Sequence, residues 1–223
     1  MQKPPAPALL CVFARAPEPG RVKTRLGLDG QAAAALHLAL CDDTCRLTRG
    51  LAARRQLAVA SDATDRSLVA LAEREGMDVM AQRGEDLGER LHAAIDEGLR
   101  DGADRVVVIG SDAPHAPPAL IAEALAALDK VDCVLGPAED GGYWLVGARR
   151  PLPTLFAGIA WGTDAVLAQS LERLAAAGAS WRLVGGCWDV DTPADLARLA
   201  RLLVDDPAGA PATYAALAEL GIL

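Results

Sequence analysis

The chain has 223 residues, of which 52 % are hydrophobic, so it is long enough to bury the core of a single α/β domain. Its formal net charge of −8 argues against a nucleic-acid-binding protein, which would need a basic face. The N-terminal apolar run is short and ends at Arg15, and no apolar stretch reaches the length of a membrane span. Five scattered cysteines without metal-ligand spacing predict reduced thiols in or near the core. We therefore expect a cytoplasmic protein that binds neither nucleic acid nor a membrane.

Short apolar runs alternate with helical patterns along the chain, which is typical of layered α/β domains. Strands are predicted at residues 9–14, 56–60, 77–81, 105–109, 133–135, 143–146 and 181–184. Large aliphatic residues at helical spacing predict helices between them, as at residues 36, 40, 47 and 51 and at residues 87, 91, 95 and 99. The strand at 105–109 is apolar at nearly every position, which indicates that both faces of the sheet are covered. The predicted fold class is therefore a three-layer, Rossmann-like α/β/α domain with a mostly parallel central sheet.

One domain is expected to span residues 1–223, because no repeat, low-complexity tract or linker interrupts the pattern. The last segment, residues 205–223, is predicted to be a docking helix or an interface, and a homodimer is one possible consequence. Ligands of open parallel sheets bind in the crevice beyond the carboxyl ends of the strands. Four polar motifs directly follow predicted strands, so we expect them to converge on one such crevice although they lie far apart in the sequence.

The first motif is the basic loop "RAPEPGRVKTRL", which carries four basic residues and one acidic residue. An extended backbone would direct the alternating Arg21, Lys23 and Arg25 to one side, where guanidinium and ammonium groups match phosphate oxygens. Gly20 would permit a tight turn or the close approach of a phosphate. The alternative is a solvated charged loop, and the motif is neither a Walker A loop nor a dinucleotide fingerprint. The predicted phosphate-binding residues of this loop are Arg15, Gly20, Arg21, Lys23 and Arg25.

Carboxylates in two further motifs predict a site for a hard divalent cation. Asp112 of "GSDAPHAPP" follows the most apolar strand, and Asp189 and Asp191 of "WDVDTPADL" stand two residues apart, so an extended backbone would face both the same way. Mg²⁺ or Mn²⁺ takes such oxygen ligands together with phosphate and water. The alternative for Asp112 is a turn or a helix cap. Thr192 and Asp195 are assigned a structural role, as a capping box that begins a helix at Pro193.

The fourth motif, "GPAEDGGYWLVG", places two acidic residues before paired glycines. Gly141 and Gly142 would form a hairpin turn, or they would let a substrate approach the backbone. Glu139 or Asp140 would bind hydroxyl groups or act as a general base, and of these two Asp140 is preferred.

Two subsidiary motifs carry weaker signals. In "QRGEDLGERL", Gln82 would read a nucleobase edge or an acceptor hydroxyl, and Arg90 would reach a phosphate or simply lie exposed on its helix. In "WGTDAV", Thr163 is expected to cap the following helix.

Taken in order, all six motifs resemble those of a family of bacterial glycosyltransferase-A-like transferases associated with radical-SAM/selenodomain proteins. The resemblance runs from about residue 9 to residue 199 and implies a nucleotide-diphospho-sugar transferase fold. More distantly, the basic loop and "DVDTPADL" are similar to those of 2-phospholactate guanylyltransferases. That similarity implies a magnesium ion held by Asp112, Asp189 and Asp191. One fold hosts many reactions, so the resemblance leaves the chemistry open.

Three hypotheses about function follow. The first is glycosyl transfer from a nucleotide-sugar to a small acceptor, with Mg²⁺ neutralising the departing diphosphate and Asp140 orienting or deprotonating the acceptor. The second is nucleotidyl transfer from a nucleoside triphosphate to a phosphorylated small molecule, which the charge of the basic loop fits better. The third is a nucleotide-binding module without catalytic activity. The glycosyl hypothesis leads, with Lys23, Asp112 and Asp140 as the catalytic residues.

Overall fold

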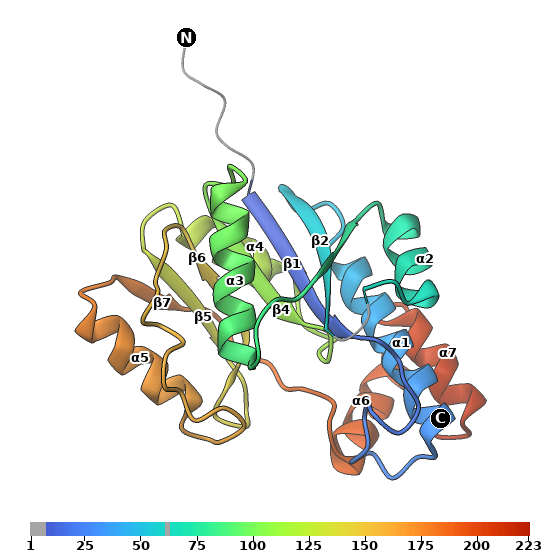
Figure 1. The fold of residues 1–223 in the computed structure, drawn as a ribbon. Coiled ribbons are helices and arrows are strands. Elements are labelled where there is room, and N and C mark those ends of the chain that lie inside the picture. Colours follow the sequence, from blue (N-terminus) through green and yellow to red (C-terminus); the bar gives the residue numbers. More distant parts are fainter. Residues whose placement is uncertain (1–7, 61–62) are drawn as a thin grey trace.

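The computed structural model describes residues 8–60 and 63–223, and in them the chain forms one seven-stranded sheet (Figure 1). The strands follow the order β3-β2-β1-β4-β6-β5-β7 across the sheet. Their bounds are β1 (Ala8–Arg15), β2 (Ala53–Ala60), β3 (Asp78–Ala81), β4 (Val106–Gly110), β5 (Cys133–Pro137), β6 (Tyr143–Ala148) and β7 (Trp181–Leu183). Only β6 runs antiparallel to its neighbours, β4 and β5. Each predicted strand overlaps an observed one, and the mostly parallel sheet is confirmed.

Helices cover both faces of the sheet (Figure 1). Their bounds are α1 (Gly30–Leu47), α2 (Arg66–Glu75), α3 (Leu87–Arg100), α4 (Pro118–Ala127), α5 (Val166–Ala176), α6 (Pro193–Asp205) and α7 (Pro211–Glu219). Alternate residues of β1 belong to two separate cores: Leu10 packs with α1, α2 and α4, and Leu9 packs with α3 and α5. The predicted three-layer domain is therefore confirmed, and burial on both faces explains why its central strands are apolar throughout.

Of the two predicted helix caps, the one at α6 is confirmed and the one at α5 is wrong. Asp29 accepts hydrogen bonds from the first amides of α1, and Thr192 and Asp195 form the expected capping box at α6. Thr163 does not cap a helix, because α5 begins only at Val166. Its hydroxyl instead donates to the carbonyl of Ala160, so it stabilises a turn in the preceding loop.

The described part of the chain contains no helix that is both long and apolar enough to span a membrane. All five cysteines are free and buried, as the sequence predicts.

The C-terminal helix α7 packs against α1 through an unusual cap. No side chain near the start of α7 caps its first turn. Instead the buried carboxylate of Asp43, in α1, accepts hydrogen bonds from the amides of Thr213 at 2.7 Å and Ala212 at 3.2 Å. A helix leaves its first amides without intrahelical partners, so Asp43 satisfies donors that burial would otherwise penalise.

We therefore expect Asp43→Ala to lower the free energy of unfolding by about 2–3 kcal/mol, the cost of a lost cap and of buried unpaired amides. Urea unfolding measures the change, with Asp42→Ala on the same helix as a control. Equal stability of the Asp43→Ala variant and the wild-type protein would contradict this role.

Candidate active site

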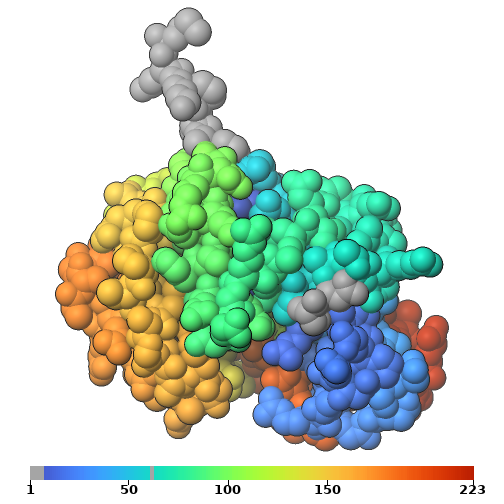
Figure 2. Space-filling view, viewed as in Figure 1, coloured from blue at the N-terminus to red at the C-terminus, as the bar shows by residue number. Residues whose placement is uncertain are grey.

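A cavity of about 700 Å³ opens at the edge of the sheet where β1 and β4 end. Figure 2 shows the surface hollowed between the blue N-terminal segment and the green-to-orange half of the molecule. Residues from all four polar motifs line it, so segments far apart in the sequence do converge on one crevice. The predicted site residues in its lining are Arg15, Arg21, Lys23, Arg25, Gln82, Arg90, Asp112, Asp140, Gly142, Asp189 and Asp191. Those outside its lining are Gly20, Glu139 and Gly141.

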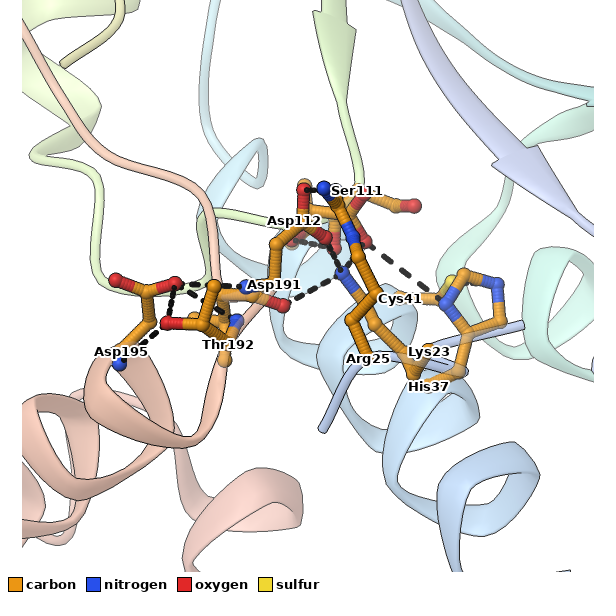
Figure 3. A network of polar contacts seen from close by, with 11 residues as sticks. Lys23, Arg25, His37, Cys41, Ser111, Asp112, Asp191, Thr192 and Asp195 are labelled. Carbon is orange, nitrogen blue, oxygen red and sulfur yellow. Dashed lines mark hydrogen bonds and ion pairs between the residues drawn. The ribbon is translucent and has the colours of Figure 1, made fainter. Parts of the chain in front are cut away.

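Lys23 lies at the centre of the polar cluster (Figure 3). Its ammonium Nζ lies 2.7 Å from Asp112 Oδ1 and 3.1 Å from Asp191 Oδ1, and it donates a 2.8 Å hydrogen bond to the carbonyl of Val190. Only 4 % of the side chain is exposed. Burial alone would lower the pKa of Lys23, but the two carboxylates outweigh it and raise the pKa above its ordinary value. The ammonium thus joins the loop after β1 to the segments after β4 and β7.

The basic loop is not the extended strip that the sequence predicts. Among the described residues, Lys23 is the only non-glycine residue with a positive φ, at 50°. This conformation turns the chain, so Lys23 points into the protein while Arg21 and Arg25 remain 77 % and 74 % exposed. Arg21 pairs with Glu18, and Arg25 pairs with the second oxygen of Asp191. One cation is therefore built into the acidic cluster, and two arginines lie in the mouth of the cleft.

The three carboxylates are electrostatically coupled. Burial alone would raise the pKa of Asp112, but Lys23 and the neighbouring His37 more than compensate and hold the pKa below its ordinary value. Burial raises the pKa of Asp189 to about 7, and the negative charges of Asp112 and Asp191 add to the increase. Crowded carboxylates of this kind are stabilised by an additional cation.

The donor set suits Mg²⁺ or Mn²⁺, because every side-chain donor is a hard carboxylate oxygen. The described residues contain no group of three or more acidic, histidine or cysteine side chains already arranged around a metal position. In the observed arrangement, the Lys23 ammonium bridges the carboxylates of Asp112 and Asp191. The three aspartates therefore suit a divalent cation in their chemistry, and in this structure Lys23 holds two of them together.

Helix α1 supports this cluster through residues that the sequence analysis missed. The buried His37 ring lies 3.8 Å from Asp112 (Figure 3). Its Nε2 lies 3.1 Å from the carbonyl oxygen of Arg15. Thr44 donates a hydrogen bond to the carbonyl of Ser111. The only signal in the sequence was a histidine among the buried leucines of a helix, which is also typical of an ordinary core position.

Gln82 and Arg90 line the cleft, but their polar groups are largely engaged with the backbone. The side-chain amide of Gln82 donates hydrogen bonds to the carbonyls of Ala14 and Ala58, which fixes the side chain across the ends of β1 and β2. Arg90 donates to the carbonyls of Gly84 and Glu85 and so holds the loop before α3. Both residues shape the cleft wall, whatever further contacts a substrate adds.

The β5–β6 connection is a hairpin turn, which was the simpler of the two interpretations. Asp140 accepts a hydrogen bond from the amide of Gly142, and both residues line the cleft. Gly141 has a φ of 87°, and a Cβ added there would lie 2.3 Å from the carbonyl oxygen of Asp164. The close approach predicted for a substrate at Gly141 is therefore made by the protein's own backbone.

Glu139 points into a different groove. It forms a bidentate ion pair with Arg198 of α6, whose guanidinium also lies 4.2 Å from the centre of the Trp188 ring. The His115 ring packs on the Trp188 ring, with the two ring centres 3.9 Å apart and the planes tilted by 34°. Glu139 thus links the hairpin turn to α6 and is not part of the cleft. Gly20 also lies outside the cleft lining, where its φ of 77° serves the turn.

Comparison with known proteins assigns the chain to a family. Residues 44–163, more than half of the chain, match the family described as "uncharacterized protein conserved in bacteria (DUF2064)". The phosphoenolpyruvate guanylyltransferase of Sphaerobacter thermophilus is 31 % identical over 154 residues, which are 69 % of this chain and 74 % of that protein. The chain therefore belongs to the DUF2064 family, and this guanylyltransferase is a relative.

Solved structures agree with the fold. A candidate nucleotide-diphospho-sugar transferase of Desulfovibrio desulfuricans G20 is 34 % identical, with a TM-score of 0.86 and coverage of 96 % of this chain and 95 % of that chain. Glucosyl-3-phosphoglycerate synthase of Mycobacterium tuberculosis, solved with Mg²⁺ and uridine diphosphate, shares the fold at 15 % identity and a TM-score of 0.52, covering 89 % and 79 % of the two chains.

These relatives confirm the nucleotide-diphospho-sugar transferase fold and the expected class, a nucleotide-using transferase. The association with radical-SAM proteins stays a resemblance in sequence only.

Proposed function

We propose that the protein is a nucleotidyltransferase that joins a nucleoside monophosphate to a small anionic acceptor. An acceptor oxygen attacks the α-phosphorus of a nucleoside triphosphate, the bond between the α-phosphorus and the bridging oxygen breaks, and pyrophosphate leaves. The observation that carries this proposal is the basic loop, whose four cationic residues, Arg15, Arg21, Lys23 and Arg25, all line the cleft. A triphosphate and an anionic acceptor together carry more negative charge than a nucleotide-sugar, so they make better use of these cations.

The acidic residues of the cleft would bind the metal ion, and the basic residues bind the triphosphate. Asp112, Asp189 and Asp191 would hold Mg²⁺ or Mn²⁺, which when bound neutralises phosphate oxygens as charge develops on them. Lys23 and Arg25 provide charge-assisted hydrogen bonds to the triphosphate. Arg21 and Arg25 are the more exposed cations of the loop.

A phosphate or carboxylate acceptor is already ionised at neutral pH, so it needs no general base. Asp140 then holds the hairpin turn through its bond to Gly142 and is not required to remove a proton. The relative from Sphaerobacter thermophilus suggests guanosine triphosphate and phosphoenolpyruvate as the first substrates to try.

Glycosyl transfer, the leading hypothesis from the sequence, is the second candidate. It is favoured by the similarity to the Desulfovibrio desulfuricans protein over nearly the whole of both chains. In that reaction a nucleoside diphosphate leaves, and Asp140 serves as the base for an acceptor hydroxyl.

Product analysis separates the two reactions. The protein is incubated with Mg²⁺ and either guanosine triphosphate plus phosphoenolpyruvate or a panel of other triphosphates, nucleotide-sugars and acceptors. We expect pyrophosphate to appear in step with consumption of the triphosphate and of the acceptor. Release of a nucleoside diphosphate from a nucleotide-sugar, dependent on an acceptor, would support glycosyl transfer instead. The Asp112→Asn variant provides the background rate for both readouts.

Arg25→Ala is expected to weaken binding of the triphosphate by about 1–2 kcal/mol, or about 5- to 30-fold, because one charge-assisted contact is lost. Arg83→Ala is a matched control: both arginines are 74 % exposed and each pairs with one carboxylate, but Arg83 lies outside the cleft lining. Calorimetric titration with a non-hydrolysable triphosphate measures both. Equal affinities of the two variants would show that Arg25 does not contact the nucleotide.

A further inference from the structure

The Lys23 side chain points into the acidic cluster, between Asp112 and Asp191 (Figure 3). Its ammonium is nearly inaccessible and is surrounded by oxygens of three residues, Asp112, Asp191 and Val190, at 2.7–3.1 Å. The loop reaches this position only through the strained positive φ of Lys23 itself. A residue whose task was only to hold phosphates would lie open in the cleft, as Arg25 does.

We propose that Lys23 is a stand-in cation. Its ammonium keeps Asp112 and Asp191 together before substrates bind, and it leaves them when a divalent cation arrives and moves to the phosphates of the nucleotide. This inference rests on the proposed function for the identity of the phosphate ligand. The exchange of the ammonium for the divalent cation does not depend on it, because it involves only Lys23, Asp112 and Asp191.

The charge balance gives the exchange a direction. An ammonium and a divalent cation both take oxygen ligands, but the divalent cation supplies twice the charge to the acidic cluster. The nucleotide then offers the displaced ammonium new oxygen partners. Binding of the metal and binding of the nucleotide therefore help each other, because each favours the state in which Lys23 has moved.

The first test is binding of Mn²⁺ alone, without nucleotide, to Lys23→Met and Arg25→Met. Both substitutions remove one positive charge beside Asp191, but only Lys23 also contacts Asp112. We expect Lys23→Met to tighten Mn²⁺ binding about tenfold or more and Arg25→Met to change it much less. Unchanged or weaker binding by a folded Lys23→Met protein would overturn the proposal.

The second test uses the wild-type protein, so it does not depend on the stability of a variant. The chain has three lysines, Lys3, Lys23 and Lys130, and the exposed Lys130 serves as an internal reference. Acetylation by a water-soluble reagent is followed by peptide mass spectrometry. We expect Lys23 to react slowly alone, several-fold faster with Mg²⁺, and slowly again when a non-hydrolysable triphosphate is added.

A Lys23 acetylation rate that Mg²⁺ leaves unchanged would overturn the stand-in role. The outcomes are separable from the proposed function. Pyrophosphate release without any cation-dependent change at Lys23 keeps the nucleotidyl reaction and rejects the exchange. A cation-dependent change at Lys23 without pyrophosphate release keeps the exchange and rejects the nucleotidyl reaction.

Discussion

Asp112→Asn is expected to lower kcat by about 10²–10³-fold or more while the protein remains folded. Asp112 follows the central strand β4, contacts Lys23 and lies beside His37, so its carboxylate is held by both the basic loop and α1. The amide keeps the shape of the side chain but removes the negative charge that a divalent cation requires. Electrostatic groups that act on developing charge are worth this much in other active sites. Steady-state kinetics measures the loss, and the circular dichroism spectrum reports the fold.

Asp140→Asn is the matched control for this prediction. Asp140 lines the same cleft, and the amide oxygen of asparagine can still accept the hydrogen bond from Gly142. For nucleotidyl transfer to an ionised acceptor we expect less than about a tenfold loss in kcat, since no base is removed. A loss as large as that of Asp112→Asn would favour the glycosyl reaction. Full activity of Asp112→Asn would contradict the role of the acidic cluster itself.

The second large effect is on stability. Gly141→Ala is expected to lower the free energy of unfolding by about 3 kcal/mol or more, because it combines a strained positive φ with overlap against backbone atoms. The added Cβ would lie 2.3–2.7 Å from atoms of Asp164, and backbone cannot move aside as a flexible side chain would. The amide of Leu167 donates to the Gly141 carbonyl, so the loop before α5 would shift with the turn.

Gly102→Ala separates the cost of the positive φ from the cost of the overlap with Asp164. Gly102 has a φ of 90°, close to the 87° of Gly141, but its added Cβ meets nothing within 4 Å. We expect about 1–2 kcal/mol at Gly102, the cost of the backbone conformation alone. Urea unfolding of both variants gives the difference. Equal losses in stability would mean that the contact with Asp164 is not tight in solution.

The layers of the fold were predictable from the sequence because they depend on local patterns. The buried strand β4 is apolar throughout, and Thr192, Pro193 and Asp195 carry the signals of a helix start within four residues. The convergence of the polar loops was also predictable, since it follows from one topological rule about parallel sheets. These inferences need no knowledge of which residues touch.

The details of the site depend on contacts between distant residues, which no local pattern contains. Nothing near Lys23 indicates a positive φ, because the contacts that support it come from residues more than 80 positions away. The cap that Asp43 provides to α7 spans 170 residues, and the pairing of Glu139 with Arg198 spans 59. For the same reason the alternation of Arg21, Lys23 and Arg25 indicated a one-sided strip that the folded loop does not form.

The most direct measurement is the position of Mn²⁺ by anomalous scattering in crystals grown with a non-hydrolysable nucleoside triphosphate. The account predicts an anomalous peak in contact with carboxylate oxygens of Asp112, Asp189 and Asp191, with the phosphates facing the basic loop. Nucleotide bound in the cleft with the metal held elsewhere, or with no metal at these three aspartates, would contradict it.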